Sequence, residues 1–331
     1  MPKLPLLEKE FWFNAEPDIV NNLKGKVVLI DFWDYTCVNC IRTFPYIKEW
    51  HKRYANKGLI IIGVHAPEFA FAKERKNVAR AIEDFNLKYP IVMDNEFTIW
   101  QYLSNRHWPA KYIFDKVGML HYEHFGEGNY GETEAMIQKL LREIDQDIEL
   151  PEIMKPVRDT DIPGAVCYQV TPEIYLGNEQ GHIGNEEVCG GTGIFEFLDP
   201  KTYKEDIYYL DGTWWIGSEY IRLESRNWEP GSIIINYYAG EVNLVIRPEK
   251  DTGFKVYVEQ DKNPLIQENK GKDIKTDLED RTYLLIKKPQ MYNIIKNKKT
   301  GRHILRLTAT SHSFTAYAFT FVSFCKLPPS R

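Results

Sequence analysis

Cys37 and Cys40 are the side chains of this sequence whose types and spacing point most directly to chemistry. Two cysteines separated by two residues can close a disulfide across one helical turn with little backbone movement. They follow an apolar, β-branched segment at residues 27–32, and apolar residues then recur at helical spacing, at Ile41 and Phe44. We therefore expect Cys37 between a buried strand and a helix, where the helix dipole favours a thiolate. Cys40, one turn later, would be the more buried, resolving thiol.

A CxxC pair can also be half of a zinc site or two inert, buried thiols. A structural zinc site needs four ligands, commonly from a second CxxC or from a histidine pair. The other cysteines are distant in sequence and lack that spacing: Cys167, Cys189 and Cys325. His51 and His65 are each isolated, so we expect no metal. A CxxC beside a βαβ pattern favours redox chemistry.

Four strings carry a resemblance to a known family: DFWDYTCVNCIRTFPY, GLIIIGVHAPEFAF, NRHWPAKYIFDKVGML and HYEHFGEGNYGETE. An acid precedes the first cysteine by six residues, and a proline follows the second by five. With this layout the sequence resembles the thioredoxin superfamily. It is similar in more detail to the soluble thioredoxin-like C-terminal region of DipZ-type cytochrome c biogenesis and thiol-transport proteins. The resemblance covers residues 25–141 and continues through TPEIYLG and AYAFTF.

The resemblance implies a role for each residue around the pair. Cys37 would attack a substrate disulfide, and Cys40 would resolve the mixed disulfide. Asp31 matches the buried acid that accepts the proton of Cys40, although a hydrogen-bonded structural acid is the alternative. Pro109 matches a cis proline facing the CxxC, so the backbone at Trp108 would bind an extended substrate. The alternative for Pro109 is a trans proline that opens an edge strand.

Further residues are candidates for binding or tuning. Tyr35 and Thr36 directly precede Cys37 and are candidates for substrate binding. An apolar rim around Cys37 would be formed by Trp33, Tyr35 and Trp108. Core packing is the alternative for Trp33. Glu68, in the loop after the strand at residues 59–65, would tune Cys37 or be a solvated loop acid. We expect no cofactor other than the redox-active Cys37–Cys40 disulfide.

The composition limits the class of partner and the compartment. The net charge is −5 and no long basic run occurs, which argues against nucleic acid or an anionic membrane surface. No apolar stretch approaches 18 residues, so we expect no membrane insertion. The N-terminus lacks the apolar core of a signal peptide, which predicts a cytoplasmic protein, with a trimmed extracytoplasmic domain as the alternative. In the cytoplasm Cys167, Cys189 and Cys325 would be free thiols.

The 331 residues predict two domains. We expect an α/β thioredoxin-like domain at residues 1–150, opened by a lead-in segment, a linker at 151–164, and an all-β sandwich domain at 165–331. In the first domain, periodicity predicts strands at 27–32, 59–65, 91–93, 111–115 and 119–123, and helices at 38–56, 73–86, 98–104 and 132–144. In the second it predicts strands at 213–224, 232–239, 241–247, 254–259, 282–287, 291–295, 303–309 and 316–324, as in a jelly roll.

The leading functional hypothesis is a thiol–disulfide oxidoreductase that acts on protein thiols or disulfides. In the cytoplasm it would act as a reductant, and an upstream reductase or other electron donor would reduce its cysteine pair again. The alternative is a binding or adaptor protein whose sandwich, similar to carbohydrate-binding modules, recognises a glycan or a protein. Its motivation is the aromatic content, including Trp214, Trp215 and Trp228, which would otherwise be buried. A peroxidase is less favoured, because Pro45 follows the cysteine pair. Association of the chain with itself stays open.

Overall fold

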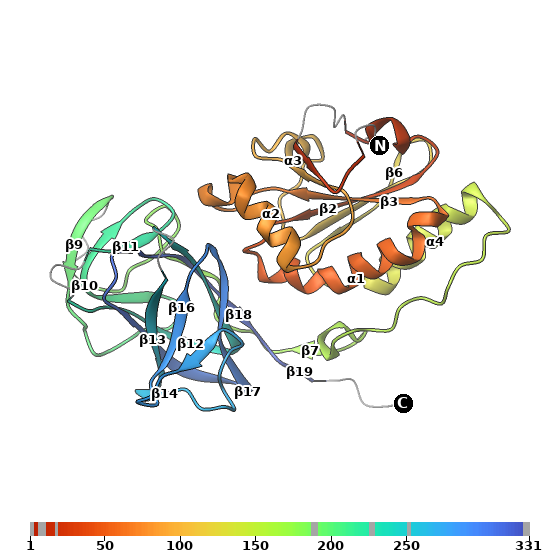
Figure 1. Ribbon diagram of the computed structural model, residues 1–331. Coiled ribbons are helices and arrows are strands. Elements are labelled where there is room, and N and C mark those ends of the chain that lie inside the picture. Colours follow the sequence, from red (N-terminus) through yellow and green to blue (C-terminus); the bar gives the residue numbers. More distant parts are fainter. Residues whose placement is uncertain are drawn as a thin grey trace. The chain divides into compact units, whose positions relative to one another are not determined.

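The computed structural model describes residues 3–5, 11–16, 19–186, 191–224, 229–249 and 253–326 (Figure 1). The chain divides into two compact units, Met1–Ala165 and Val166–Lys326. The first combines helices with a sheet, whereas the second, in its described residues, contains strands and loops. The predicted order, a thioredoxin-like α/β region followed by a β-rich region, is confirmed.

The first unit is built on a six-stranded mixed sheet in the order β1-β4-β3-β2-β5-β6. Its strands are β1 (Phe11–Phe13), β2 (Val27–Trp33), β3 (Leu59–His65), β4 (Ile91–Met93), β5 (Ala110–Phe114) and β6 (Leu120–Phe125). Strands β2, β3 and β4 are parallel, and the other neighbours pair antiparallel. β1 was not predicted: part of the lead-in segment pairs with β4 and forms an edge of the sheet.

The central strand β2 is buried on both faces. On one face its side chains join a core shared with α3 residues: Val28, Ile30 and Phe32. Because side chains alternate across a strand, Asp31 points to the opposite face together with Trp33. Trp33 contacts Phe44 of the following helix, with ring centroids 5.5 Å apart. Asp31 is therefore enclosed on the face covered by the helix that carries Cys40.

The α-helices of the first unit are α1 (Val38–Tyr54), α2 (Arg75–Asp84), α3 (Thr98–Tyr102) and α4 (Tyr130–Ile144). Short 3-10 turns occur at η1 (Ile19–Leu23), η2 (Ala55–Lys57), η3 (Ala70–Lys73) and η4 (Asp159–Asp161). Helices α1 and α4 lie side by side (Figure 1), and the Tyr54 hydroxyl donates to Glu134 Oε1 at 2.6 Å. In the described part of the chain no helix is long and apolar enough to cross a membrane.

Residues 151–164, predicted as a linker, lie along α1 and α4. The backbone N–H of Met154 donates to Glu134 Oε2 at 2.8 Å, and that of Val157 donates to the Tyr46 hydroxyl at 2.7 Å. Glu134 and Tyr46 are both buried, so these bonds satisfy polar groups that would otherwise be costly. The segment belongs to the first compact unit.

The second unit contains an eleven-stranded sheet in which neighbouring strands pair antiparallel. Its strands are β8 (Ile174–Tyr175), β9 (Gly193–Phe197), β10 (Tyr208–Ile216), β11 (Ile221–Leu223), β12 (Gly231–Pro248), β13 (Phe254–Gln260), β14 (Asn263–Pro264), β15 (Ile274–Thr276), β16 (Thr282–Ile286), β17 (Gln290–Ala309) and β18 (Phe314–Val322).

Two of these strands differ from the prediction in length. β12 and β17 are continuous over 18 and 20 residues, where the sequence predicts two strands each. The two pair with each other along most of their length, and a register shift between Ala239 and Glu241 accommodates Gly240 without a chain reversal. Conversely, the strand predicted at 213–224 is split, because a turn closed by Gly217 and Tyr220 separates β10 from β11.

A separate two-stranded sheet joins the two ends of the second unit. It consists of β7 (Val166–Cys167) and β19 (Cys325–Lys326). The register of the two strands places Cys167 opposite Cys325, and a disulfide joins them. These two residues are therefore not the free thiols expected of a cytoplasmic chain. Cys189 lies outside the described residues.

Candidate active site

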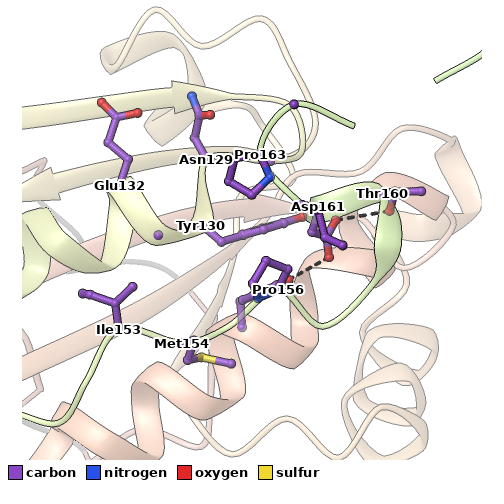
Figure 2. Close-up of a pocket in the computed structure, with 14 residues that line it drawn as sticks. Asn129, Tyr130, Glu132, Ile153, Met154, Pro156, Thr160, Asp161 and Pro163 are labelled. Carbon is purple, nitrogen blue, oxygen red and sulfur yellow. Dashed lines mark hydrogen bonds between the residues drawn. The ribbon is translucent and has the colours of Figure 1, made fainter. Parts of the chain in front are cut away.

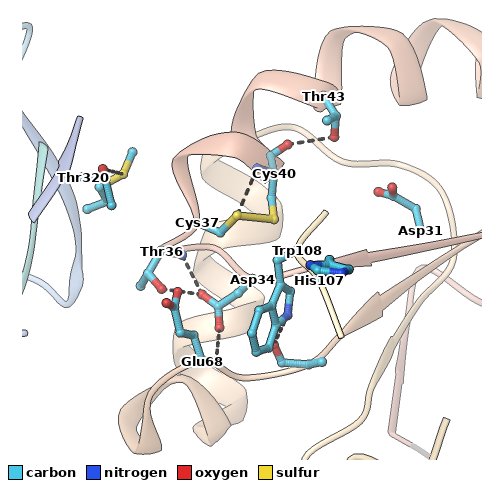
Figure 3. Close-up of a disulfide and its surroundings, with 12 residues drawn as sticks. Asp31, Asp34, Thr36, Cys37, Cys40, Thr43, Glu68, His107, Trp108 and Thr320 are labelled. Atoms are coloured by element: carbon cyan, nitrogen blue, oxygen red, sulfur yellow. Dashed lines mark hydrogen bonds between the residues drawn. A yellow bond between two sulfur atoms is a disulfide. The ribbon is translucent and has the colours of Figure 1, made fainter. Parts of the chain in front are cut away.

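The Cys37–Cys40 pair lies at the start of α1, as predicted (Figure 3). Cys37 is the N-cap residue, and its sulfur accepts a hydrogen bond from the backbone N–H of Cys40 at 3.1 Å. The side chains form a disulfide in which Cys37 is 7% exposed and Cys40 is fully buried. Cys37 is therefore the sulfur that an incoming thiolate can reach, and in the reduced state the helix start favours its thiolate.

Asp34 shapes the loop between β2 and Cys37. Its Oδ1 accepts hydrogen bonds from the backbone N–H and the hydroxyl of Thr36, both at 2.6 Å. Its Oδ2 accepts from the backbone N–H of Glu68 at 2.9 Å, and its backbone carbonyl accepts from Cys37 N at 3.3 Å. The buried carboxylate thus fixes the loop that presents Cys37 and ties it to the loop after β3.

Trp108 lies on the opposite side of the site (Figure 3), and Pro109 follows it in the sequence. The peptide bond between them is cis, as the resemblance implied. The partly exposed Trp108 indole donates to the carbonyl oxygen of Ala66 at 3.0 Å, and its ring lies 4.3 Å from that of Trp100. Ala66 in turn donates through its backbone N–H to Trp33 O at 3.1 Å. Ala66 therefore connects the loop that carries Trp108 and Pro109 with the end of β2.

Asp31 forms a fully buried pair with Lys111 of β5, its register partner across the sheet. Lys111 Nζ lies 3.8 Å from Asp31 Oδ1, and neither carboxylate oxygen has a hydrogen-bond partner within the described residues. Burial raises the pKa of Asp31 to about 6, although Lys111 opposes the rise. Burial also lowers the pKa of Lys111. Figure 3 shows the Asp31 carboxylate directed from β2 toward the helix that carries Cys40.

Sequence comparison places the chain among known proteins. Residues 15–123 match the AhpC/TSA family, and residues 171–321 match a family described as the thioredoxin like C-terminal domain. ResA of Bacillus cereus, named a thiol-disulfide oxidoreductase, is 30% identical over 121 residues, which cover 37% of this chain and 67% of ResA. The chain belongs to the thioredoxin superfamily.

Within this superfamily the chain is also similar to DipZ of Mycobacterium tuberculosis. The two are 34% identical over 243 residues, which cover 71% of this chain and 33% of DipZ. The chain therefore spans about a third of the length of the DipZ proteins that it matches. A solution structure of a thioredoxin-like protein in the oxidised form is 26% identical and covers 43% of this chain and 96% of that protein, with a TM-score of 0.39.

The other candidate residues of this thioredoxin-superfamily site are mostly enclosed. Tyr35 and Thr36 are buried: Tyr35 stacks on His65 with ring centroids 5.7 Å apart, and the Thr36 hydroxyl is bound to Asp34. These side chains shape the loop rather than offer a surface to a substrate. Trp33 is also in the core, so the predicted aromatic rim reduces to Trp108.

Glu68 is partly exposed and, in Figure 3, lies beside Asp34 and Thr36 near Cys37. Its backbone N–H is one of the groups that Asp34 binds. His65, behind this loop, has its Nε2 3.7 Å from Asp34 Oδ2. Burial lowers the pKa of His65, so its imidazole is neutral near pH 7. Glu68 therefore lies near the cysteine pair, as the sequence predicts, and its backbone is held there by Asp34. Its role in tuning Cys37 stays a prediction.

Sequence reasoning missed Asp34 and Lys111. Asp34 carried a local signal, since an aspartate two residues before a threonine is typical of a turn closed by the aspartate side chain. Lys111 carried a weaker one, because a lysine inside the apolar segment AKYIF needs a buried partner. Only the strand register identifies that partner as Asp31.

A cavity of about 520 Å³ lies elsewhere in the first unit, near the start of α4 (Figure 2). Its wall includes Tyr130, Ile153, Pro156, Asp161 and Pro163, but neither active-site cysteine. Asp161 already accepts a hydrogen bond from the Tyr46 hydroxyl at 2.7 Å and is paired with Arg158. Among the described residues, no cluster of three or more histidine, cysteine or acidic side chains is arranged to hold a metal ion.

Proposed function

We propose that this chain is a thiol–disulfide oxidoreductase that reduces disulfides in protein substrates. The observation that carries the proposal is the asymmetry of the pair: Cys37 is accessible at the helix start and Cys40 is sealed beneath it. The family membership and the name of the ResA relative support the same activity. The Cys37–Cys40 disulfide itself is the proposed redox group, with no additional cofactor.

The proposed reaction begins with the reduced pair. The Cys37 thiolate attacks one sulfur of the substrate disulfide, and the other substrate sulfur leaves as a thiolate and takes up a proton. Cys40 then loses its proton and attacks Cys37 in the mixed disulfide. The second substrate sulfur is released, the Cys37–Cys40 disulfide forms, and two electrons have passed to the substrate.

Asp31 is proposed to accept the proton of Cys40, directly or through a water molecule. With a pKa of about 6, the carboxyl is largely ionised near neutral pH, yet is a stronger base than an ordinary aspartate. Trp108 and the backbone beside the cis Pro109 are proposed to hold the substrate, because the partly exposed ring lies across from the disulfide (Figure 3) and the cis peptide bond joins Trp108 to Pro109.

The test is reduction of insulin disulfides by the full chain in the presence of dithiothreitol. We expect Cys37→Ala to abolish turnover and Cys40→Ala to accumulate a mixed disulfide with insulin. Cys189→Ser is the control that alters a cysteine outside the pair and should keep wild-type turnover. Wild-type turnover in both active-site variants, with unchanged circular dichroism, would refute the proposal.

The direction of exchange depends on the reduction potential of the pair. A value near about −270 mV supports the proposed reductant, whereas one near about −120 mV indicates an oxidant. Continued reduction also needs an upstream reductase or other electron donor, because each turnover leaves the pair oxidised. Equilibration with glutathione buffers, followed by alkylation of Cys37, measures the potential.

The second unit has a proposed role in binding partner proteins. We propose that its sheet folds over into a sandwich of the jelly-roll type, as the sequence predicts. The glycan alternative loses one of its motivating residues, because Trp214 is buried. Trp215 is partly exposed, and the Arg222 guanidinium lies 5.8 Å from its ring centroid. Trp228 lies outside the described residues. Glycan binding that survives Cys37→Ala would support the glycan alternative. The oligomeric state of the chain would be tested separately by analytical ultracentrifugation.

The Cys167–Cys325 disulfide bears on the proposed compartment. Structural disulfides persist in oxidising compartments and are rare in the cytoplasm. We therefore propose that the chain works outside the cytoplasm, in line with the alternative that the sequence left open. Labelling of this cysteine pair in intact cells with a thiol reagent tests the compartment: an unlabelled, cross-linked pair supports it and a labelled pair contradicts it.

A further inference from the structure

The Cys167–Cys325 disulfide is a second sulfur pair, distinct from the Cys37–Cys40 site. Its cysteines are 158 positions apart in sequence and face each other across β7 and β19. This sheet has only two strands of two residues each. Two further contacts join the same segments: Tyr168 N donates to Phe324 O at 3.4 Å, and Lys326 Nζ lies 5.7 Å from the centroid of the Tyr168 ring.

The two sulfur pairs differ in how a thiol can approach them. Cys167 is exposed, as is its neighbour Val166, whereas Cys325 is partly buried. Thiol–disulfide exchange requires direct access of the attacking thiolate to a sulfur, so exposed disulfides are the ones that exchange in folded proteins. In this pair the sulfur open to attack is that of Cys167.

Each side of the disulfide is anchored to the main sheet by its own contacts. On the Cys167 side, Thr171 N donates to Tyr238 O at 3.0 Å and Tyr238 N donates to Thr171 Oγ1 at 2.9 Å. Thr171 is buried and is only four residues from the cysteine. The chain on this side is therefore fixed to β12 whether or not the sulfur bond is present.

On the Cys325 side, Phe324 N donates to Thr300 Oγ1 at 3.1 Å. The Phe324 ring covers Gly240, where an added Cβ would lie 2.5 Å from the ring. This anchor falls on β12 two residues from Tyr238, the anchor of the other side. If the disulfide opened, the two thiols would therefore stay close, and the same bond would be able to form again.

From this geometry we propose that Cys167–Cys325 is a second site of thiol–disulfide exchange, which opens and closes while the eleven-stranded sheet stays folded. The reactant is a thiol or a dithiol. Its thiolate attacks Cys167 Sγ, and Cys325 leaves as a thiolate that takes up a proton. A second thiol, from the same dithiol or from another thiol molecule, then loses its proton and attacks the reductant's sulfur in the adduct. Cys167 leaves as a thiolate and takes up a proton. The reductant becomes a disulfide, and two electrons have reduced the cysteine pair.

The first experiment maps every cysteine of the full chain without denaturant. The protein is treated with a dithiothreitol series, alkylated, and digested for mass spectrometry. Cys167 and Cys325 should be unlabelled before reduction and should become labelled together, while the near-ultraviolet circular dichroism is retained. Removal of the reductant and addition of oxidised glutathione should restore the same cross-link. Labelling before reduction, a cross-link to Cys189, or labelling that requires denaturant would each overturn the proposal.

The second experiment tests which sulfur is accessible. With one partner removed, oxidised glutathione should form a mixed disulfide with the remaining thiol. We expect Cys325→Ser, which leaves Cys167, to react at least several-fold faster than Cys167→Ser, which leaves Cys325. Cys189→Ser is the matched control and should retain the wild-type cross-link. Equal rates, or a faster reaction at Cys325, would contradict the assignment, and the wild-type labelling series decides the proposal even if a single variant misfolds.

The proposed exchange at Cys167–Cys325 does not depend on the enzyme activity proposed for Cys37 and Cys40. The labelling series is repeated in the Cys37→Ala, Cys40→Ala double variant, which lacks the first sulfur pair. We expect Cys167 and Cys325 to open at the wild-type dithiothreitol concentration in that variant. Protection of the pair there would show that its opening requires the active site, which would refute an independent second site.

Discussion

Lys111 Nζ lies 3.8 Å from Asp31 Oδ1, and both side chains are fully buried. Neither charged group has a side-chain hydrogen bond within the described residues, although Lys111 Nζ lies 5.8 Å from the centroid of the Tyr130 ring. The pair therefore lacks the hydrogen bonds that offset the cost of burying charge. Burial accordingly raises the pKa of Asp31 to about 6 and lowers the pKa of Lys111. The site retains an acid whose protonation changes near neutral pH.

Asp31→Asn is expected to change how stability depends on pH. Because the Asp31 pKa rises from 3.8 to about 6 on folding, the native chain binds more protons than the unfolded chain between these values. The free energy of unfolding therefore falls as pH rises through this window, by about 3 kcal/mol once the group is ionised in both states. The variant should lose this decrease, as measured by urea denaturation.

Asp145→Asn, which alters an exposed carboxyl, is the control for that experiment. It should keep the wild-type dependence on pH. Parallel stability curves for wild type and Asp31→Asn would contradict the raised pKa assigned to the buried Asp31 carboxyl.

Lys111→Met is expected to raise the pKa of Asp31 further. Lys111 is the group that lowers the Asp31 pKa, and methionine has similar length but no charge. The acidic limb of the pH–rate profile for insulin reduction should move to higher pH, since Asp31 would have to ionise without its cation. Lys116→Met, at an exposed lysine, should leave the profile in place. An unmoved profile in Lys111→Met would exclude Lys111 as a positioning residue for Asp31.

Substitutions at Asp34 should have graded effects on Cys37. Asp34→Ala removes the three hydrogen bonds that the Asp34 carboxylate accepts from Thr36 and Glu68. Each such loss in a buried setting costs about 1–3 kcal/mol. Asp34→Asn keeps one acceptor oxygen, so it should serve only one of the two partners and lose less stability.

The same variants test whether Asp34 positions Cys37. The pH dependence of Cys37 alkylation by iodoacetamide should shift to higher pH in Asp34→Ala, because the loop that sets the helix start would be less fixed. Asp34→Asn should restore part of the wild-type profile. A loss of stability with an unchanged Cys37 profile would leave Asp34 with a structural role alone.

Trp108→Ala is expected to raise the KM for insulin more than it lowers kcat. The ring is the partly exposed aromatic group beside the pair, and it is held by the Ala66 carbonyl rather than by either cysteine. Trp108→Phe keeps an aromatic surface but loses the N–H donor, so its KM should fall between those of wild type and Trp108→Ala. Equal KM values in all three proteins would exclude the ring from substrate binding.

Much of the first unit was predictable, because its signals are local. The apolar segment before Cys37 and the helical periodicity after it locate β2 and α1 to within about two residues. The Asp31–Lys111 pair was not predictable, since it depends on the register between strands about 80 positions apart. The short edge strand β1 was missed because three aromatic residues carry no period of their own.

The second unit was less predictable for a related reason. Polar stretches within β12 and β17 look like turns in sequence, yet strand pairing on either side carries the chain through them. The Cys167–Cys325 disulfide joins residues that no local pattern connects. Both features arise from long-range pairing, which outweighs local propensity in sheets.

The hydrogen bonds from residues 151–164 to Tyr46 and Glu134 determine how the redox unit can be excised as a recombinant fragment. A fragment that stopped at residue 150 would lack the N–H donors that bind the Tyr46 hydroxyl of α1 and the Glu134 carboxylate of α4. It would also lack the residues that line the cavity together with Tyr130. The shortest fragment that keeps every one of these bonds extends through Asp161, whose carboxylate receives the Tyr46 hydroxyl.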